Sequence, residues 1–192
     1  MIDYVYVKIG NERLFIEKAT DLGYSELVLC YVLPEAKQLT SEMKDKLVDS
    51  TDLKLFFGII DEIKQISLKN NLFEKQIALG TSLKTSFRGL TEVYDNEFTK
   101  EKDAIHQRRA GLNHTILNEF REKNINVLFS IINFENLREI EKPTVLGRAK
   151  QNLKACRRAN TNYLLVSLAK RPEEMKSLVD LKALRKILEQ PN

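Results

Sequence analysis

The runs NVLFSII at residues 126–132 and YLLVSL at residues 163–168 decide the fold class of this chain. Each run is short, almost continuously apolar and rich in β-branched or aromatic side chains, as is typical of a strand buried on both faces. Similar or weaker strand patterns occupy residues 3–9, 27–33, 53–60, 76–79 and 92–94. Burial on both faces favours a parallel sheet that is covered by helices.

Amphipathic helix patterns fall between most of these strands. They occupy residues 12–22, 41–48, 112–123, 145–159 and 177–189. Alternation of strands and helices predicts a parallel α/β fold, and the absence of the phosphate-binding patterns GxGxxG and GxxxxGK[ST] disfavours an open nucleotide-binding sheet. A full (β/α) barrel needs about 250 residues. We therefore expect residues 1–192 to form one domain, a small and distorted TIM-like (β/α) barrel with about seven strands.

Composition indicates an ordinary globular protein. Hydrophobic residues make up 43% of the chain and charged residues 30%, and no apolar run is long enough for a transmembrane helix. We see no signal peptide pattern at the N-terminus and expect a cytoplasmic protein with no membrane partner. Cys30 and Cys156 lie in apolar or helical settings and are expected to be reduced thiols in the core.

Charge is distributed unevenly along the chain. Residues 1–105 carry 14 Lys and Arg against 18 Asp and Glu, whereas residues 106–192 carry 17 against 9. A basic half on a compact protein is typical of a contact with RNA or DNA. A basic surface that is simply solvated remains the alternative.

Three basic constellations stand out in the second half. Residues 106–114, HQRRAGLNH, place Arg108 and Arg109 before a predicted helix, where they would suit a phosphate or a carboxylate. The predicted helix 145–159 carries five cations without an acid among them. Lys170 and Arg171 directly follow the last predicted strand, and loops at the carboxyl ends of barrel strands carry function.

Patterns for catalysis or metal binding are weak. The two histidines, His106 and His114, form no zinc-binding spacing, and no serine lies on a GxSxG elbow. We therefore predict no catalytic residue and no metal ligand in this chain. Aromatic RNA-binding motifs, zinc fingers and helix-turn-helix patterns are also absent, so an RNA contact would be to backbone and shape and would be sensitive to salt.

Three blocks in the second half resemble ribonuclease P protein component 3, the barrel-fold subunit of archaeal and eukaryotic ribonuclease P. HQRRAGLN at 106–113 is close to the family pattern H-x-R-x-S-G-L-N, with Ala110 in place of Ser. VLFS at 127–130 is followed by GRAKQNL at 147–153. SLAKRPEEMK at 167–176 leads to Asp180 and Leu181, with Lys176 where Arg is commoner. The likeness covers residues 106–190 and is thin over 1–105.

The resemblance implies a distorted barrel related to metal-dependent phosphoesterases of the PHP group, without their metal ligands. It implies a subunit that binds and stabilises the catalytic RNA, whose own Mg²⁺ serves the removal of the 5′ leader from precursor tRNA. The chain would bind no cofactor, and its partners would be ribonuclease P RNA, precursor tRNA through the complex, a small ferredoxin-like subunit and other ribonuclease P proteins. Within this hypothesis the residues expected to face RNA are Arg108, Arg109, Arg148, Lys150, Lys154, Arg157, Arg158, Lys170 and Arg171.

Four residues of the family motifs are expected to act structurally: His106, Gly111, Asn113 and Asp180. Two other hypotheses stay open. The first is a metal-dependent phosphoesterase of the related barrel group, for which the plausible ligand set is Asp3, Asp61, Asp95 and His106. The second is a barrel that binds other proteins and has no role with nucleic acid.

Overall fold

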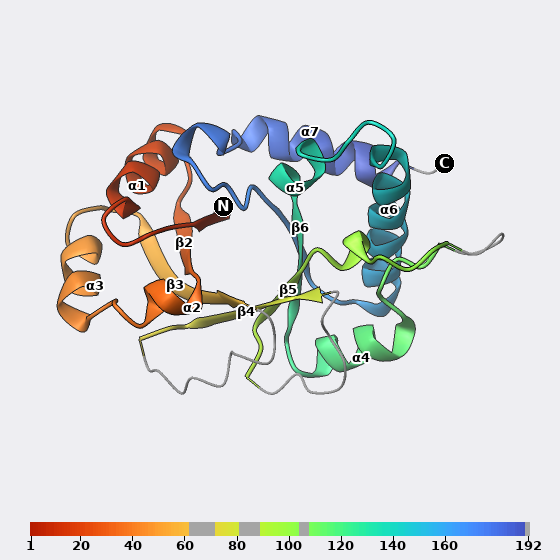
Figure 1. Cartoon of the computed structure of the whole chain (residues 1–192), viewed down its shortest axis with the longest axis horizontal. Coiled ribbons are helices and arrows are strands. Elements are labelled where there is room, and N and C mark those ends of the chain that lie inside the picture. The colour runs from red at the N-terminus through yellow and green to blue at the C-terminus, as the bar shows by residue number, and fades with distance from the viewer. Residues whose placement is uncertain (62–71, 81–88, 104–107, 191–192) are drawn as a thin grey trace.

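A computed structural model describes residues 1–61, 72–80, 89–103 and 108–190 of the chain. Seven strands lie in these ranges: β1 (Ile2–Tyr6), β2 (Glu26–Tyr31), β3 (Lys54–Asp61), β4 (Lys75–Leu79), β5 (Glu92–Tyr94), β6 (Asn126–Ser130) and β7 (Tyr163–Val166). They form one sheet in sequence order, and each pair of neighbours is parallel. The sheet curls into a nearly closed barrel with helices around it, which confirms the predicted TIM-like fold (Figure 1).

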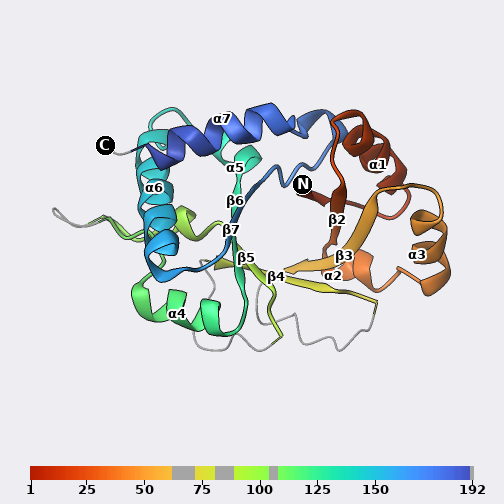
Figure 2. The same ribbon diagram turned by 180° about the vertical axis from the view of Figure 1, so that it is seen from behind.

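Helices cover the outside of the barrel. They are α1 (Glu12–Asp21), α2 (Leu33–Ala36), α3 (Ser41–Val48), α4 (His114–Glu122), α5 (Ile131–Glu135), α6 (Lys142–Ala159) and α7 (Leu178–Glu189), with the short 3₁₀ helices η3 (Asn96–Phe98) and η4 (Pro172–Glu174). Helices α1 and α3 lie on one side of the barrel and α4 and α6 on the other (Figure 1, and from behind in Figure 2). Helix α7 runs along one edge from the side of α1 to α6.

The hydrophobic core consists of three clusters. Alternate strand residues face opposite ways, so one cluster lies inside the barrel and two lie outside it, under the helices. Inward residues fill the barrel, and they include Tyr4, Cys30, Ile77 and Leu128. Outward residues pack under the helices in two clusters, one toward α1–α3 and one toward α4 and α6. A charged residue also lies inside: the buried Glu92 carboxylate accepts hydrogen bonds from Tyr4 Oη at 3.1 Å, Lys75 Nζ at 2.8 Å and Asn126 Nδ2 at 3.3 Å.

The barrel closes where the end of β7 meets β1. Val5 and Ala169 form an isolated parallel bridge, and the Tyr6 N–H donates to the Ala169 carbonyl at 2.8 Å. Between this bridge and β7, Leu168 adopts a left-handed backbone conformation (φ 48°), which interrupts regular pairing. The buried Asp3 carboxylate supplies acceptors at this place: Oδ1 accepts from Ser167 N at 2.7 Å and Oδ2 from Ser167 Oγ at 2.6 Å. We call the place where β7 meets β1 the seam, and we call the pair Asp3 and Ser167 the seam clasp.

Among the predicted strands that end early, two do so because a helix follows at once. The pattern at 126–132 predicts a strand through Ile132, but the strand ends at Ser130, whose hydroxyl caps α5 by accepting from Asn133 N at 3.3 Å. Likewise β2 ends at Tyr31, and α2 begins at Leu33. Buried apolar runs do not distinguish a strand from the first turn of a buried helix, so the sequence pattern reveals neither helix.

Other details follow the sequence more closely. Gly23 follows the end of α1 with φ 75°, as expected for a residue after a helix end. Both cysteines are buried free thiols. On α1, Leu14 is 55% exposed, whereas Phe15, Ile16 and Ala19 lie in the core. No helix in the described part of the chain is long and apolar enough to span a membrane.

The seam clasp should give the fold a measurable pH dependence. Burial raises the pKa of Asp3 to about 6, from a usual value of 3.8. Because the folded chain then holds the Asp3 proton more tightly than the unfolded chain, this group makes the free energy of unfolding fall as pH rises from about 4 to about 6, by ~1.4 kcal/mol per pH unit at most. Asp3→Asn keeps an acceptor for Ser167 N and should lose that slope, as measured by urea unfolding at stepped pH.

Asp3→Ala distinguishes the clasp from a general loss of charge. It leaves the N–H and hydroxyl of Ser167 without the carboxylate, so at pH 7 it should destabilise the chain by about 1–3 kcal/mol more than Asp3→Asn does. The exposed Asp21→Asn is the control and should leave the slope unchanged. Equal stability of the two Asp3 variants would contradict the clasp.

Candidate nucleic-acid interface

A groove of about 640 Å³ runs along the outer side of α6. It is bounded by α6, by the segment that begins at Arg108 and by the end of α7. Five of its lining residues are cations: Arg108, Lys150, Lys154, Arg157 and Arg158. The other lining residues are Gly147, Gln151, Leu153, Leu188, Glu189 and Gln190. We call this feature the basic groove.

Helical periodicity explains why the cations gather. The face of α6 that carries Ala149, Leu153 and Cys156 is buried against the sheet. Residues spaced three or four apart share a helix face, so Lys150, Lys154 and the pair at 157–158 line up on the flank that remains. The helix ends at Ala159, and Asn160 follows it in the left-handed conformation (φ 52°). Arg157 and Arg158 in the last turn are exposed.

Few acids offset these charges. Across residues 1–61, 72–80, 89–103 and 108–190, Arg108, Lys154, Arg157 and Arg158 form no ion pair. The lining acid Glu189 is already bound, because its Oε1 accepts from Arg185 Nε and from Tyr163 Oη, both at 2.8 Å. The groove therefore presents a row of available cations, which is suited to a chain of phosphates.

A second, shallower hollow adjoins the groove and shares Arg108 and Gln151 with it. Arg109 lies there but is paired, since its Nη1 lies 3.0 Å from Glu101 Oε2. Gly111 has φ 85°, and a Cβ atom there would lie 2.4 Å from the Asn96 carbonyl oxygen, so the turn requires glycine. Asn113 caps α4, its side chain accepting from Ile116 N at 2.9 Å.

Arg148 does not face the groove, which corrects its assignment to an RNA-facing surface. Its side chain is buried, and its guanidinium points to the segment of residues 97–103 instead. The physical reason is position on the helix: the next residue along, Ala149, faces the core, and Arg148 lies on the edge where the 97–103 segment packs.

Lys170 and Arg171 lie apart from the groove, beyond the end of β7. The ammonium of Lys170 lies 5.6 Å from the centre of the Tyr6 ring. Burial raises the pKa of Asp95, after the carboxyl end of β5, and the charge of Lys170 offsets part of that rise. Arg171 pairs with Glu174 at 2.7 Å. The structure thus brings together five of the nine predicted cations in the groove. Arg109 lies in the adjoining hollow, and Arg148, Lys170 and Arg171 lie elsewhere.

Two more family-motif residues were expected to act structurally. Asp180 forms a capping box at the start of α7, where its Oδ2 accepts from Ser177 Oγ at 2.7 Å and its own N–H donates to that hydroxyl. His106 lies outside the described residues.

Buried carboxyl groups near η3 are a feature that the sequence did not reveal. Asp95 follows β5 in the left-handed conformation (φ 58°), and burial raises its pKa to about 7. Glu97 is fully buried against α6, and burial, with a contribution from the charge of Asp95, raises its pKa to about 8. Asp95 Oδ2 accepts from Asn133 Nδ2 at 2.5 Å. Asp95 was expected only as a candidate metal ligand, and nothing in the sequence pattern indicates that either carboxyl group is buried.

Two of the four candidate metal ligands, Asp3 and Asp95, lie at opposite ends of the barrel, and a third, His106, lies outside the described residues. Asp3 lies near the amino end of β1 and binds Ser167, whereas Asp95 follows the carboxyl end of β5. In a parallel barrel these two ends are opposite. Among described residues no group of three His, Cys, Asp or Glu side chains is placed to hold a metal ion.

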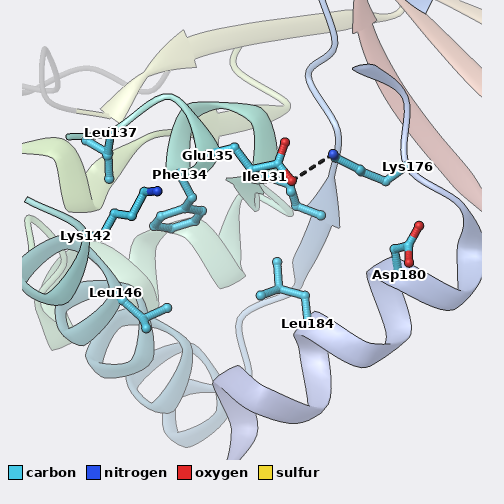
Figure 3. A pocket seen from close by; sticks show the side chains of 9 residues that line it. All are labelled: Ile131, Phe134, Glu135, Leu137, Lys142, Leu146, Lys176, Asp180 and Leu184. Atoms are coloured by element: carbon cyan, nitrogen blue, oxygen red, sulfur yellow. Dashed lines mark ion pairs between the residues drawn. The ribbon is translucent and has the colours of Figure 1, made fainter. Parts of the chain in front are cut away.

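A pocket of about 580 Å³ between α5, α6 and α7 has a different character (Figure 3). Its walls are aliphatic and aromatic, with Phe134, Leu146 and Leu184 among them. The Glu135 and Lys176 charges at its rim are paired at 2.7 Å (Figure 3). Such a pocket suits an apolar group rather than a phosphate, so the basic groove is the better candidate for a polyanion.

Comparison with known proteins supports the fold. No protein-family model matches the sequence, and no curated protein sequence matches it. The chain is similar to a chain in a solved structure titled "cryo-EM structure of archaeal Ribonuclease P with mature tRNA". The TM-score is 0.76 at 17% sequence identity, over 100% of this chain and 84% of that one. At this identity the likeness establishes a shared barrel fold.

The buried Glu97 predicts a second pH effect. Since its folded pKa of about 8 exceeds the usual 4.5, the free energy of unfolding should fall as pH rises through that interval, by ~1.4 kcal/mol per pH unit at most. Glu97→Gln is neutral at every pH and should gain stability relative to the natural chain as pH rises from 5 to 8. Urea unfolding at stepped pH measures this difference, with the exposed Glu122→Gln as control. Parallel pH profiles would show that Glu97 ionises normally.

Proposed function

We propose that this chain is a protein subunit of ribonuclease P and that it binds the catalytic RNA of that enzyme through the basic groove. The observation that carries the proposal is the groove itself, in which five cations line one face of a TIM-like barrel. Among the described residues, Arg108, Lys154, Arg157 and Arg158 form no ion pair. The full-length likeness to a chain from archaeal ribonuclease P with tRNA supports the choice of complex. The sequence blocks at 106–113, 147–153 and 167–176 support the same choice.

In this proposal the chain supplies binding rather than catalysis. Removal of the 5′ leader from precursor tRNA is carried out by the RNA with its own Mg²⁺, and the protein neutralises phosphates so that the RNA fold is stable. The partners proposed with it are the small ferredoxin-like subunit and other ribonuclease P proteins, in the cytoplasm. The proposed contacts are to RNA backbone, because the groove lacks aromatic side chains on which bases could stack.

The groove sets the expected strength of the salt dependence. Each cation that neutralises a phosphate releases counterions, so the affinity falls with salt by a logarithmic slope of about −0.7 to −0.9 per contact. If all five groove cations contact phosphates, the slope is about −4. An accidental contact through one or two surface lysines would give a much shallower slope.

RNA retention tests the proposal directly. An archaeal ribonuclease P RNA transcript, incubated with the full chain and titrated with KCl, should show the steep slope. Arg157→Glu combined with Arg158→Glu should weaken binding at least tenfold, because two attractive contacts become repulsive. Both side chains are exposed, so the thermal unfolding midpoint and the circular dichroism spectrum should not change.

The matched control reverses two exposed charges on the far side of the barrel. Lys37→Glu with Lys46→Glu changes the net charge equally but leaves the groove intact. Equal weakening by both double variants would mean that only net charge matters, and no retention by the natural chain would refute the proposed function.

A further inference from the structure

Arg108 lines one end of the basic groove, and two adjacent residues of α6, Gly147 and Arg148, fix its position. Gly147 faces the Arg108 side chain, and Arg148 faces the 97–103 segment that leads toward it. Neither residue offers a free charge to solvent, so neither is itself suited to bind a phosphate.

Arg148 fastens the 97–103 segment to α6. Its Nη1 donates to the Thr99 carbonyl at 2.7 Å, and its Nη2 donates to the Glu101 carbonyl at 2.6 Å. Its Nε and Nη2 lie 2.9 Å and 2.7 Å from Asp103 Oδ1. A planar guanidinium can satisfy these several acceptors together, whereas an ammonium cannot.

Asp103 connects Arg148 to the backbone of the segment that begins at Arg108. The same Oδ1 atom that binds Arg148 also accepts from the Arg109 backbone N–H at 2.8 Å. The Arg148 guanidinium is the largest cause that lowers the pKa of Asp103, which keeps the carboxylate ionised for both contacts. Two further bonds hold the same stretch on α6: the Arg108 carbonyl accepts from Gln151 Nε2 at 3.0 Å, and the Ala110 carbonyl accepts from Asn152 Nδ2 at 2.7 Å.

Gly147 gives the Arg108 side chain its place. A Cβ atom at Gly147 would lie 2.3 Å from Arg108 Nη1 and 2.4 Å from Arg108 Cζ, so the guanidinium lies directly against the helix backbone. The Gly147 backbone is not in the left-handed region, and alanine is the better helix former in the middle of a helix. Glycine at this position therefore allows the Arg108 guanidinium to lie against the helix, and it does not stabilise the helix itself.

We infer that Gly147 and Arg148 are positioning residues that preorganise Arg108 as a phosphate ligand before RNA binds. Fixing a flexible arginine in advance removes the cost of ordering it in the complex, so binding gains affinity without any added contact. The inference rests on the proposed function, since it needs the groove to bind RNA.

Gly147→Ala is the decisive variant, because it displaces only the far end of a flexible side chain and should leave the fold intact or slightly more stable. Binding of the archaeal ribonuclease P RNA transcript to the full chain should weaken about three- to tenfold. The salt slope should become shallower by about 0.7 to 0.9, the value of one lost phosphate contact. The exposed Thr144→Ala on the same helix is the control and should change neither quantity.

A double variant separates positioning from a general structural effect. If Gly147 acts through Arg108, Gly147→Ala should cause no additional loss of affinity in an Arg108→Ala background. Arg148→Lys should weaken binding and lower the thermal unfolding midpoint, because lysine cannot replace the fork of contacts to the 97–103 segment. Binding by Gly147→Ala equal to that of the natural chain, or full additivity with Arg108→Ala, would overturn the inference while leaving the proposed function standing. No RNA retention by the natural chain would refute both.

Discussion

Closure of the barrel between β1 and β7 is the constraint on which the rest of the structure depends. The backbone ladder is weak at this seam, since β7 is short and Leu168 breaks regular pairing before Ala169 reaches β1. Asp3 compensates by accepting from both the N–H and the hydroxyl of Ser167 within the core. A buried carboxyl is costly unless it is hydrogen-bonded, so the clasp favours closure of the barrel by the segment that carries Ser167. With the seam closed, β6 and β7 lie where α6 and α7 can cover them.

Helix α6 has three faces with different roles. Its apolar stripe packs on the sheet, its Arg148 and Asn152 side chains hold the segments on either side of residues 104–107, and its remaining flank presents cations to solvent. A helix can do this because side chains one residue apart point about 100° away from each other. The basic groove is thus bounded by elements that the core already fixes, and its cations extend from a rigid support.

Buried carboxyl groups also shape the electrostatics of the molecule. Asp95 and Glu97 have pKa values raised by burial to about 7 and about 8, so part of the acidic charge counted from the sequence is neutralised near neutral pH. The formal net charge of +4 therefore understates the positive charge of the folded chain. This effect reinforces the field of the groove, because Glu97 lies on the inner side of the helix that carries most of the cations.

Local sequence patterns were enough to predict the fold class, most of the strands and the helix that bears the cations. Apolar runs and helical stripes report burial, and the removal of apolar surface from water is the main driving force that selects these elements. The strand ends at Ser130 and before Val32 were not predicted, because a buried strand and the first turn of a buried helix have the same apolar composition. Tertiary packing, by contrast, determined which basic residues are available. Arg148 and Arg157 look equivalent in the sequence, yet one is enclosed by a segment from the other half of the chain and the other is exposed. The environment of a charge depends on which distant segment packs beside it, and that information is not local.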